Sequence, residues 1–433
     1  MDHKTLVVGV PKFSRQNGWW RLSAALHIEG TQDSILPAHQ KEMWFSLPEE
    51  YAEEFVFPDC SDCFLFGLLY YAMRFGYNIH IQGTVSKEVL YNVKNELMPI
   101  MAAFRSCLRP IDITAVQTRS YPKGKYVGTG FSAGIDSFYT IVGNLKDHLF
   151  PEDKLTHLFF FNVGTHDLGR SFEELDHARK KFLMRYESFV PAAKEIGLPF
   201  IPVDSNVHSF LPDNIAAGIS VSNAAAVHFL RKGVWQYLLS SDGRNYLEWF
   251  KYIKTSPWEE QIDLAHMELV LCQWLGDRTL WIKPYGTNVT RLEKTEFLVD
   301  YPPARHCLNV CNSVDMMEKN CSVCLKCRRT MLDLELLGKL DEFRSVFDVD
   351  MFRTRFKSRD FAELMYPPPE HENQYLNNSR AYAIRHGIDI KSQSAAVDRI
   401  CAYMHQTWIY QLLDRVRLLD AVKRLLGRHK QLN

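Results

Sequence analysis

The sequence predicts an α/β protein built on a doubly wound parallel sheet, preceded by an α+β domain and followed by a helical extension. From Tyr126 to Leu275 apolar strand patterns alternate with helical patterns, as a parallel sheet with crossover helices requires. Before about residue 120 short strands lead into helices, and after about residue 340 only helical patterns remain. With 433 residues, several cores can form. We expect domains at 1–120, 121–340 and 341–433.

The composition is that of a globular protein without an electrostatic bias. Its 51 basic residues balance 51 acidic ones, so we expect neither nucleic acid nor an anionic membrane as a partner. The N-terminus lacks a charged segment followed by an apolar one, and no run of about 18 apolar residues occurs. These features indicate a cytoplasmic protein, in which the ten cysteines stay reduced unless a metal binds them.

The segment before residue 120 predicts the α+β domain. Strand patterns occur at 6–10 and 19–28, around an Asn17-Gly18 turn, and at 43–47, 78–83 and 111–116. Helical patterns cover 62–75 and 87–104. Cys60 and Cys63 could form half of a metal site, but no second close pair accompanies them here, so free thiols are the better interpretation.

The central pattern of the sequence runs from Tyr126 to Gly143. An extended run ends at Phe131, small residues follow at 132–134, and an apolar helical pattern begins. A strand that enters a helix through a tight turn presents backbone N–H groups at the positive end of the helix dipole, and serine hydroxyls add further donors. This arrangement is typical of a polyphosphate site. The alternative is an ordinary turn with a serine N-cap.

The loop matches neither common nucleotide-binding pattern. Gly-x4-Gly-Lys-Ser/Thr is absent, and Gly128-x-Gly130-x-x-Ala133 only half matches the dinucleotide pattern. Residues 132–137, Ser-Ala-Gly-Ile-Asp-Ser, resemble instead the Ser-Gly-Gly-x-Asp-Ser loop of the PP-loop ATP pyrophosphatases, which release pyrophosphate when they adenylate a substrate. Ala133 departs from that loop, because its methyl group requires the backbone to avoid a positive φ or to bear strain.

Further elements complete the predicted sheet. We expect strands at 156–163, 199–205 and 234–241 and helices at 171–196, 223–232 and 266–275. Ligands of open parallel sheets bind beyond the carboxyl ends of the strands. That edge carries candidate nucleotide contacts at Asn162, Val163 and Gly164, and polar residues at Asp204, Ser205, Ser240 and Ser241. His166 and Asp167 also follow a strand, but polar turn residues are their simpler interpretation.

Four cysteines near the end of this segment form a compact motif. Cys311, Cys321, Cys324 and Cys327 have the spacing Cys-x9-Cys-x2-Cys-x2-Cys. In a chain expected in the cytoplasm, such thiols indicate a tetrahedral zinc site rather than disulfides. Four thiolates fill the coordination shell of zinc, so the site would hold structure and would not activate water.

The C-terminal part predicts helices at 330–340, 378–387 and 395–428. Residues 414–430 are basic and amphipathic. A core-facing apolar stripe with a solvated charged face is the better interpretation of this segment, and binding to a membrane surface or to a partner is the alternative.

A PP-loop followed by this cysteine spacing resembles the 7-cyano-7-deazaguanine synthase (QueC-like) family. Between the two motifs, residues 290–296 are similar to the Lys-x-Glu segment of that family, with Lys294 at the matching lysine. The resemblance covers about residues 126–338 and neither flank. It implies the PP-loop (adenine nucleotide alpha hydrolase-like) form of the fold, with ATP, Mg2+ and Zn2+ as cofactors.

The resemblance also implies residue roles. The ATP loop would consist of Ser132, Ala133, Gly134, Asp136 and Ser137, and the zinc ligands would be the four cysteines. Asp136 and Lys294 would be the catalytic residues, with Lys294 as an anion or phosphate contact. Arg291 stands one helical turn before Lys294 and could share that anion, or both could lie on a solvated helix face.

The implied activity is that of an AMP-forming ligase. Such an enzyme adenylates a 7-carboxy-7-deazaguanine-like carboxylate, releases pyrophosphate and passes the acyl group to an amine, either ammonia or a protein amine. The added flanks resemble extended members of bacterial anti-phage operons, where a protein acceptor encoded nearby is thought to act. A homodimer is left open. The alternatives are a tRNA-modifying PP-loop enzyme, against which the neutral charge argues, and a catalytically inactive ATP-binding scaffold, suggested by Ala133.

Overall fold

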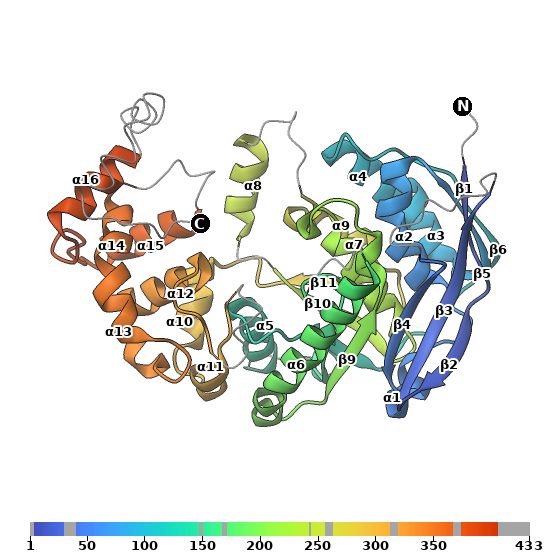
Figure 1. Cartoon of the computed structure of the whole chain (residues 1–433), viewed down its shortest axis with the longest axis horizontal. Coiled ribbons are helices and arrows are strands. Elements are labelled where there is room, and N and C mark those ends of the chain that lie inside the picture. The colour runs from blue at the N-terminus through green and yellow to red at the C-terminus, as the bar shows by residue number, and fades with distance from the viewer. Residues whose placement is uncertain are drawn as a thin grey trace. The chain divides into compact units, whose positions relative to one another are not determined.

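The structure is a computed structural model that describes residues 4–29, 40–146, 150–166, 171–241, 244–255, 263–311, 319–366 and 374–405 (Figure 1). The chain divides into two compact units. Unit 1 comprises residues 1–244 and 256–288, and unit 2 comprises residues 245–255 and 289–433. The predicted domain boundaries near residues 120 and 340 stay predictions. Asp167 and the amphipathic segment 414–430 lie outside the described residues.

Unit 1 is organised by one mixed sheet, which contains eleven strands in the described part of the chain. The strand order is β11-β10-β7-β8-β9-β4-β3-β1-β5-β6, with β2 beside β3. The strands are β1 (Thr5–Val8), β2 (Lys12–Gln16), β3 (Trp19–Ile28), β4 (Glu42–Pro48), β5 (Asn78–Ser86), β6 (Ile113–Arg119), β7 (Tyr126–Gly130), β8 (His157–Phe161), β9 (Phe200–Ser205), β10 (Val234–Ser240) and β11 (Trp281–Tyr285).

The strands from β7 to β11 form a parallel half-sheet with β7 at its centre. Neighbouring strands in the order β11-β10-β7-β8-β9 are all parallel. The chain steps outward from β7 to β9 through α5 (Ile135–Lys146) and α6 (Phe172–Ile196), and returns to β10 through α7 (Ile215–Phe229). Because such crossovers are right-handed, this reversal puts the connections on opposite faces of the sheet. The predicted α/β class and doubly wound half-sheet are confirmed, whereas the PP-loop type stays a prediction.

The N-terminal strands continue the same sheet instead of forming a separate one. Strand β4 pairs antiparallel with β9, with Phe45 opposite Ser205 and Ser46 opposite Asp204. The pairs β4–β3 and β3–β1 are antiparallel, whereas the pairs β1–β5 and β5–β6 are parallel. In Figure 1 the blue strands mark this half of the sheet. The sheet is therefore mixed and mostly parallel.

Several predicted elements differ from the structure. The strand that joins β3 through the Asn17-Gly18 turn is β2. The strand expected at 6–10 is β1, which pairs with the far end of β3, with Leu6 opposite Ile28. The helix expected at 223–232 is α7, which begins earlier because Asn214 caps it by accepting from the backbone N–H of Ala217 at 2.9 Å. The helix expected at 266–275 is reduced to α9 (Glu268–Leu271) between single 3-10 turns at Leu264–His266 and Cys272–Trp274. Strand β11 was not predicted.

The other helices of unit 1 cover the N-terminal half. They are α1 (Glu49–Phe55), α2 (Asp62–Phe75), α3 (Lys87–Asn92) and α4 (Met98–Phe104), with a π turn at Val93–Leu97 and 3-10 turns at Pro151–Asp153 and Val207–Phe210. The predicted helix at 87–104 thus contains a π turn. Aromatic rings join these helices to the sheet: Phe45 of β4 lies 6.1 Å from Phe64 of α2 and 5.7 Å from Phe229 of α7.

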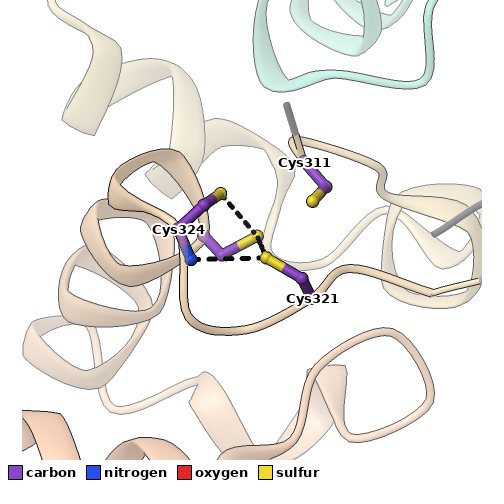
Figure 2. Close-up of side chains that lie close together, drawn as sticks. Cys311, Cys321 and Cys324 are labelled. Carbon is purple, nitrogen blue, oxygen red and sulfur yellow. Dashed lines mark hydrogen bonds between the residues drawn. The ribbon is translucent and has the colours of Figure 1, made fainter. Parts of the chain in front are cut away.

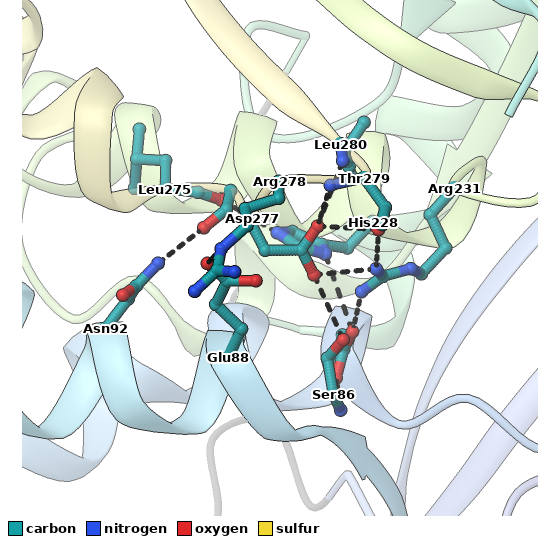
Figure 3. A network of polar contacts seen from close by, with 12 residues as sticks. Ser86, Glu88, Asn92, His228, Arg231, Leu275, Asp277, Arg278, Thr279 and Leu280 are labelled. Carbon is teal, nitrogen blue, oxygen red and sulfur yellow. Dashed lines mark hydrogen bonds and ion pairs between the residues drawn. The ribbon is translucent and has the colours of Figure 1, made fainter. Parts of the chain in front are cut away.

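A buried ionic network ties N-terminal residues to the parallel half of the sheet (Figure 3). The guanidinium of Arg231 forms ion pairs with Asp62 and, at 2.8 Å, with Asp277, and all three side chains are almost fully buried. Ser86 donates its hydroxyl to Asp277 at 3.0 Å and its backbone N–H to Asp62 at 2.7 Å. Burial lowers the pKa of the adjacent His228 to about 4, so its ring is neutral near pH 7. One cation thus serves two buried carboxylates, which also accept hydrogen bonds from Ser86 and Thr279.

Unit 2 is helical in its described part. Its helices are α8 (Tyr246–Thr255), α10 (Arg291–Leu298), α11 (Pro302–Cys307), α12 (Leu325–Leu336), α13 (Val349–Met351), α14 (Lys357–Met365), α15 (Gln374–Arg385) and α16 (Ala396–His405), with a 3-10 turn at Leu340–Phe343 and a π turn at Phe352–Phe356. Helix α12 spans most of the predicted helix at 330–340 but begins within the cysteine motif. Among the described residues, no helix has the length and apolar character needed to cross a membrane.

Candidate functional site

The loop at 131–134 lies at the point where the strand order of the parallel half-sheet reverses. It connects β7 to α5, and β7 has β8 on one side and β10 on the other. Connections that leave in opposite directions open a crevice beyond the carboxyl ends of these strands, where doubly wound proteins bind ligands. The structure therefore puts the predicted loop at the position that favours ligand binding.

Ala133 adopts the backbone conformation that favours glycine. Its φ is +55°, and its side chain is fully buried. Of the two options expected from the sequence, the loop bears the strain instead of avoiding a positive φ. An L-residue in this region costs roughly 1–2 kcal/mol, and such conformations collect at ligand-binding sites. The alanine therefore does not prevent a glycine-like loop shape.

The loop has backbone donors that no carbonyl uses. In the part of the chain that the structure describes, no carbonyl accepts from the backbone N–H of Ala133, Gly134, Ile135 or Ser137. These groups start a helix of twelve residues, whose dipole favours an anion at this end. Ser132 is exposed and Asp136 is half-buried, so both can meet a ligand.

Two hydroxyl groups fix the start of α5. Ser137 donates to the carbonyl of Gly134 at 3.0 Å, and the Thr140 hydroxyl lies 2.8 Å from that of Ser240 at the end of β10. Ser241 follows and donates its hydroxyl to the carbonyl of Gly286 at 3.0 Å. The loop after β7 and the end of β10 are thus held together, as predicted from their position on one sheet edge.

Residues 162–164 lie beside the loop, at the end of β8, but the Asn162 side chain serves the protein. Its side-chain amide N–H donates to Asp204 at 2.8 Å, and its backbone carbonyl accepts from the Ser205 hydroxyl at 2.7 Å. Val163 is buried. Gly164 has a φ of +119°, and a Cβ there would meet Ile215 at 3.0 Å. Among the described residues the Oδ1 atom of Asn162 has no hydrogen-bond partner, so a ligand contact from this segment would use this atom or the backbone.

Lys294 belongs to unit 2, where it lies on α10. The helix begins with a capping box, because Thr290 accepts from the backbone N–H of Glu293 and Glu293 accepts from that of Thr290. Lys294 is fully buried, whereas Arg291 is half-buried. The interpretation as a solvated helix face is therefore wrong for Lys294. Its catalytic role stays a prediction.

The four predicted cysteines of unit 2 lie together and could hold a metal ion such as zinc (Figure 2). Their sulfur atoms all lie within 4.8 Å of one another, and Cys327 is 3.8 Å from Cys321 and 3.4 Å from Cys324. A tetrahedral ion with zinc–sulfur bonds of about 2.3 Å requires sulfur–sulfur distances of about 3.8 Å. The donor set and its spacing therefore fit a zinc ion.

Two residues that the sequence analysis missed hold the cysteine loop in shape. Asn320 is buried and bonds two other segments, at 308–310 and at 346: its Oδ1 accepts from the N–H of Val310 at 2.8 Å, and its amide donates to the carbonyls of Leu308 at 2.8 Å and Val346 at 3.1 Å. Ser322 has a φ of +59°, and its hydroxyl accepts from the N–H of Asp348 at 2.9 Å. An asparagine beside a cysteine motif is the one local signal that could have indicated this role.

No family model, no curated protein and no solved structure matches this chain. The loop at 131–134 and the cysteine cluster are therefore defined by their own geometry.

Proposed function

We propose that this chain is an ATP-dependent, AMP-forming ligase of the QueC-like PP-loop type. The observation that carries the proposal is the loop at 131–134, which combines a glycine-like backbone at Ala133 with N–H donors at the start of α5 that no carbonyl of the described residues accepts from. Donors at the positive end of a helix dipole favour a polyphosphate. The position at the reversal of the strand order supports the same ligand.

In this proposal the loop residues hold the triphosphate. The N–H groups of Ala133, Gly134 and Ile135 bind the β- and γ-phosphates, and the Ser132 hydroxyl adds a donor. A bound Mg2+ would offset the phosphate charge, and the half-buried Asp136 carboxylate is the oxygen ligand that this loop offers it. The α-phosphate then stays accessible to a carboxylate, because the loop orients the pyrophosphate as leaving group.

The carboxylate attacks the α-phosphorus of ATP, and pyrophosphate leaves. The product is an acyl-adenylate, from which an amine displaces AMP to form an amide. We propose a 7-carboxy-7-deazaguanine-like acid as the substrate and a protein amine or ammonia as the acceptor, with anti-phage defence as the setting. The four cysteines would bind zinc as a structural ion, because four thiolates leave no open coordination position.

The test is the formation of AMP and pyrophosphate from ATP and Mg2+ with 7-carboxy-7-deazaguanine. Asp136→Asn should abolish AMP formation and leave zinc content unchanged. Asp176→Asn is the matched control, because Asp176 is an exposed carboxylate on α6 that pairs with Lys180. A mass increase of an added partner protein identifies a protein acceptor, and an amide product with ammonium identifies ammonia. ATP binding without turnover of any carboxylate would contradict the ligase and leave a scaffold.

A further inference from the structure

A row of polar side chains crosses the sheet of unit 1 on the face opposite α2 and α7. Residues Trp20, Leu22 and Ala24 of β3 are buried, and Trp20 packs toward Phe229 of α7. Side chains alternate along a strand, so Arg21 points to the other face, named here the outer face. The pairing register aligns Ser14 of β2 with Arg21, Arg21 with Ser46 of β4, and Ser46 with Asp204 of β9.

The far end of this row is already neutralised. Asp204 is completely buried and pairs with Arg179 of α6 at 2.8 Å. The same carboxylate accepts from the Asn162 amide at 2.8 Å and from the backbone N–H of Ser205 at 2.9 Å. The two hydrogen bonds go to Oδ1 and the ion pair with Arg179 to Oδ2, so Asp204 already has a cation beside it and forms no ion pair with Arg21 in the described structure.

Arg21 has an aromatic support but no ionic partner. Its guanidinium lies 4.0 Å from the centre of the Trp44 ring. Across the described ranges of the chain, this half-buried group makes no hydrogen bond and no ion pair. Burial lowers the pKa of Arg21, although Glu42 and Asp204 act to raise it. An arginine carries five N–H donors and stays charged, so the site has donors without acceptors.

The support under Arg21 is rigid. Trp44 donates its backbone N–H to the side chain of Asn206 at 2.8 Å. The Asn206 amide in turn donates to the carbonyl of Glu42 at 2.9 Å and to Gln40 at 3.1 Å. A guanidinium stacked on a fixed indole is pre-organised, because its fork needs little further ordering to bind two oxygens. Ser46 lies beside it in the row and makes no hydrogen bond through its hydroxyl among the described residues.

We propose that Arg21, supported by Trp44, is a second binding site of unit 1, one that takes an oxyanion of a ligand. Trp44 is level with Asn206, just beyond the end of β9, and therefore lies on the sheet edge that also carries the nucleotide loop. Three strand spacings, about 14 Å, separate β4 from β7. The guanidinium fork fits a carboxylate or a phosphate in two parallel hydrogen bonds. This proposal does not require the ligase activity.

The test is protection of Arg21 from phenylglyoxal, which modifies guanidinium groups, measured on the whole protein by mass spectrometry of the peptide that contains Arg21. We expect inorganic phosphate or acetate to slow modification of Arg21 about threefold or more relative to chloride at equal ionic strength, because a bidentate oxyanion covers the fork. Protection by phosphate alone identifies a phosphate ligand, and protection by acetate alone identifies a carboxylate ligand. Equal rates in all three salts would overturn the site.

Two controls keep the result specific. Arg15 is exposed and pairs with Glu49 at 3.0 Å, so its modification should respond equally to the three salts. Trp44→Leu removes the aromatic support and keeps Arg21, so the roughly threefold protection should fall to nearly none while the circular dichroism spectrum stays unchanged. Unchanged protection in a folded Trp44→Leu protein would contradict the role of the stack. Because no turnover is measured, an inactive protein with a protected Arg21 would separate this site from the ligase proposal.

Discussion

Two loops of this protein hold a residue other than glycine in the left-handed backbone region, and they use it differently. In the cysteine loop, Ser322 has a φ of +59°, and its hydroxyl accepts a hydrogen bond from the backbone N–H of Asp348. In the loop at 131–134, Ala133 has a φ of +55° and no polar side-chain group, and its N–H has no carbonyl acceptor in the described residues. The strain in the first loop is offset within the protein.

This difference distinguishes a loop that completes its own bonding from one that retains donors. The cysteine loop also forms hydrogen bonds within itself and to its neighbours, since the N–H of Cys324 donates to the sulfur of Cys321 at 3.3 Å and Asn320 bonds two other segments. The hydroxyl groups of Ser137 and Thr140 fix the helix start that follows the loop at 131–134. The backbone N–H groups of the loop itself still have no carbonyl acceptor among the described residues. Unused donors on a fixed frame are the physical condition for binding an anion without large rearrangement.

The largest expected effect is removal of the metal from the cysteine loop. Chelation or Cys324→Ser should lower the unfolding temperature of unit 2 and reduce bound zinc from one ion per chain to none, because apparent binding energies of structural zinc reach about 10 kcal/mol in small domains. Cys307→Ser is the control, since this cysteine of unit 2 lies outside the cluster. Calorimetry and metal analysis measure both. Identical unfolding with and without chelator would mean that the loop needs no ion.

Arg231→Leu tests how much the buried ionic network contributes to the stability of unit 1. Removing the cation leaves Asp62 and Asp277 buried together, so unfolding free energy should fall by about 3–5 kcal/mol. Arg278→Gln breaks an exposed pair with Glu88 and should cost less than about 1 kcal/mol. Urea titration compares the two variants. A loss as small as that of Arg278→Gln would show that the network does not hold the halves of the sheet.

The pH dependence of unit 2 should be altered by Asp333→Asn. Burial raises the pKa of Asp333 on α12 to about 7, although the Ser379 hydroxyl at 2.6 Å acts to lower it. The folded protein therefore keeps this proton where the unfolded chain, with a pKa of about 4, has lost it. The stabilisation is full below about pH 4 and is lost as pH rises towards 7.

Asp333→Asn should flatten that decline and leave unit 2 more stable than the original protein at pH 7. The measurement is urea unfolding between pH 4 and pH 8, with Asp341→Asn as an exposed control on the same unit. An unchanged pH profile would contradict a protonated Asp333. Helix α12 also carries Cys327, so the experiment is best done on the metal-saturated protein.

The smallest effects should come from glycine at the two strained positions. Ala133→Gly relieves about 1–2 kcal/mol of strain but loses a buried methyl worth about 0.8 kcal/mol and adds entropy to the unfolded chain, so stability should change by less than about 1 kcal/mol. Ser322→Gly also loses the hydrogen bond to Asp348, so it should be about 1 kcal/mol less stable than the original. Thermal unfolding of both variants tests the contrast. If both substitutions stabilised the protein equally, the proposed difference between the two loops would be wrong.

The sequence predicts a structural feature when neighbouring residues determine it, and it does not when the feature depends on contacts between distant segments. The strand, turn and helix at 126–146 follow from an apolar period that changes at small residues, and the cysteine cluster follows from spacing alone. The pairing of β4 with β9 joins residues far apart in the sequence, and no local pattern specifies it. The same holds for Arg231, whose partners come from two other segments, at residue 62 and at 277–279. The sign of φ at Ala133 depended on packing that the sequence does not display.

The pairing of β4 with β9 has a practical consequence for expressing the protein. Every residue of β9 is buried, and β4 is the strand that pairs with β9 on the side away from β8. A shortened chain that starts at residue 121 would present that strand to solvent as an open apolar edge, which invites pairing with other chains. Expression of such a fragment should therefore yield insoluble material, and adding residues 1–120 as a second polypeptide should restore soluble protein.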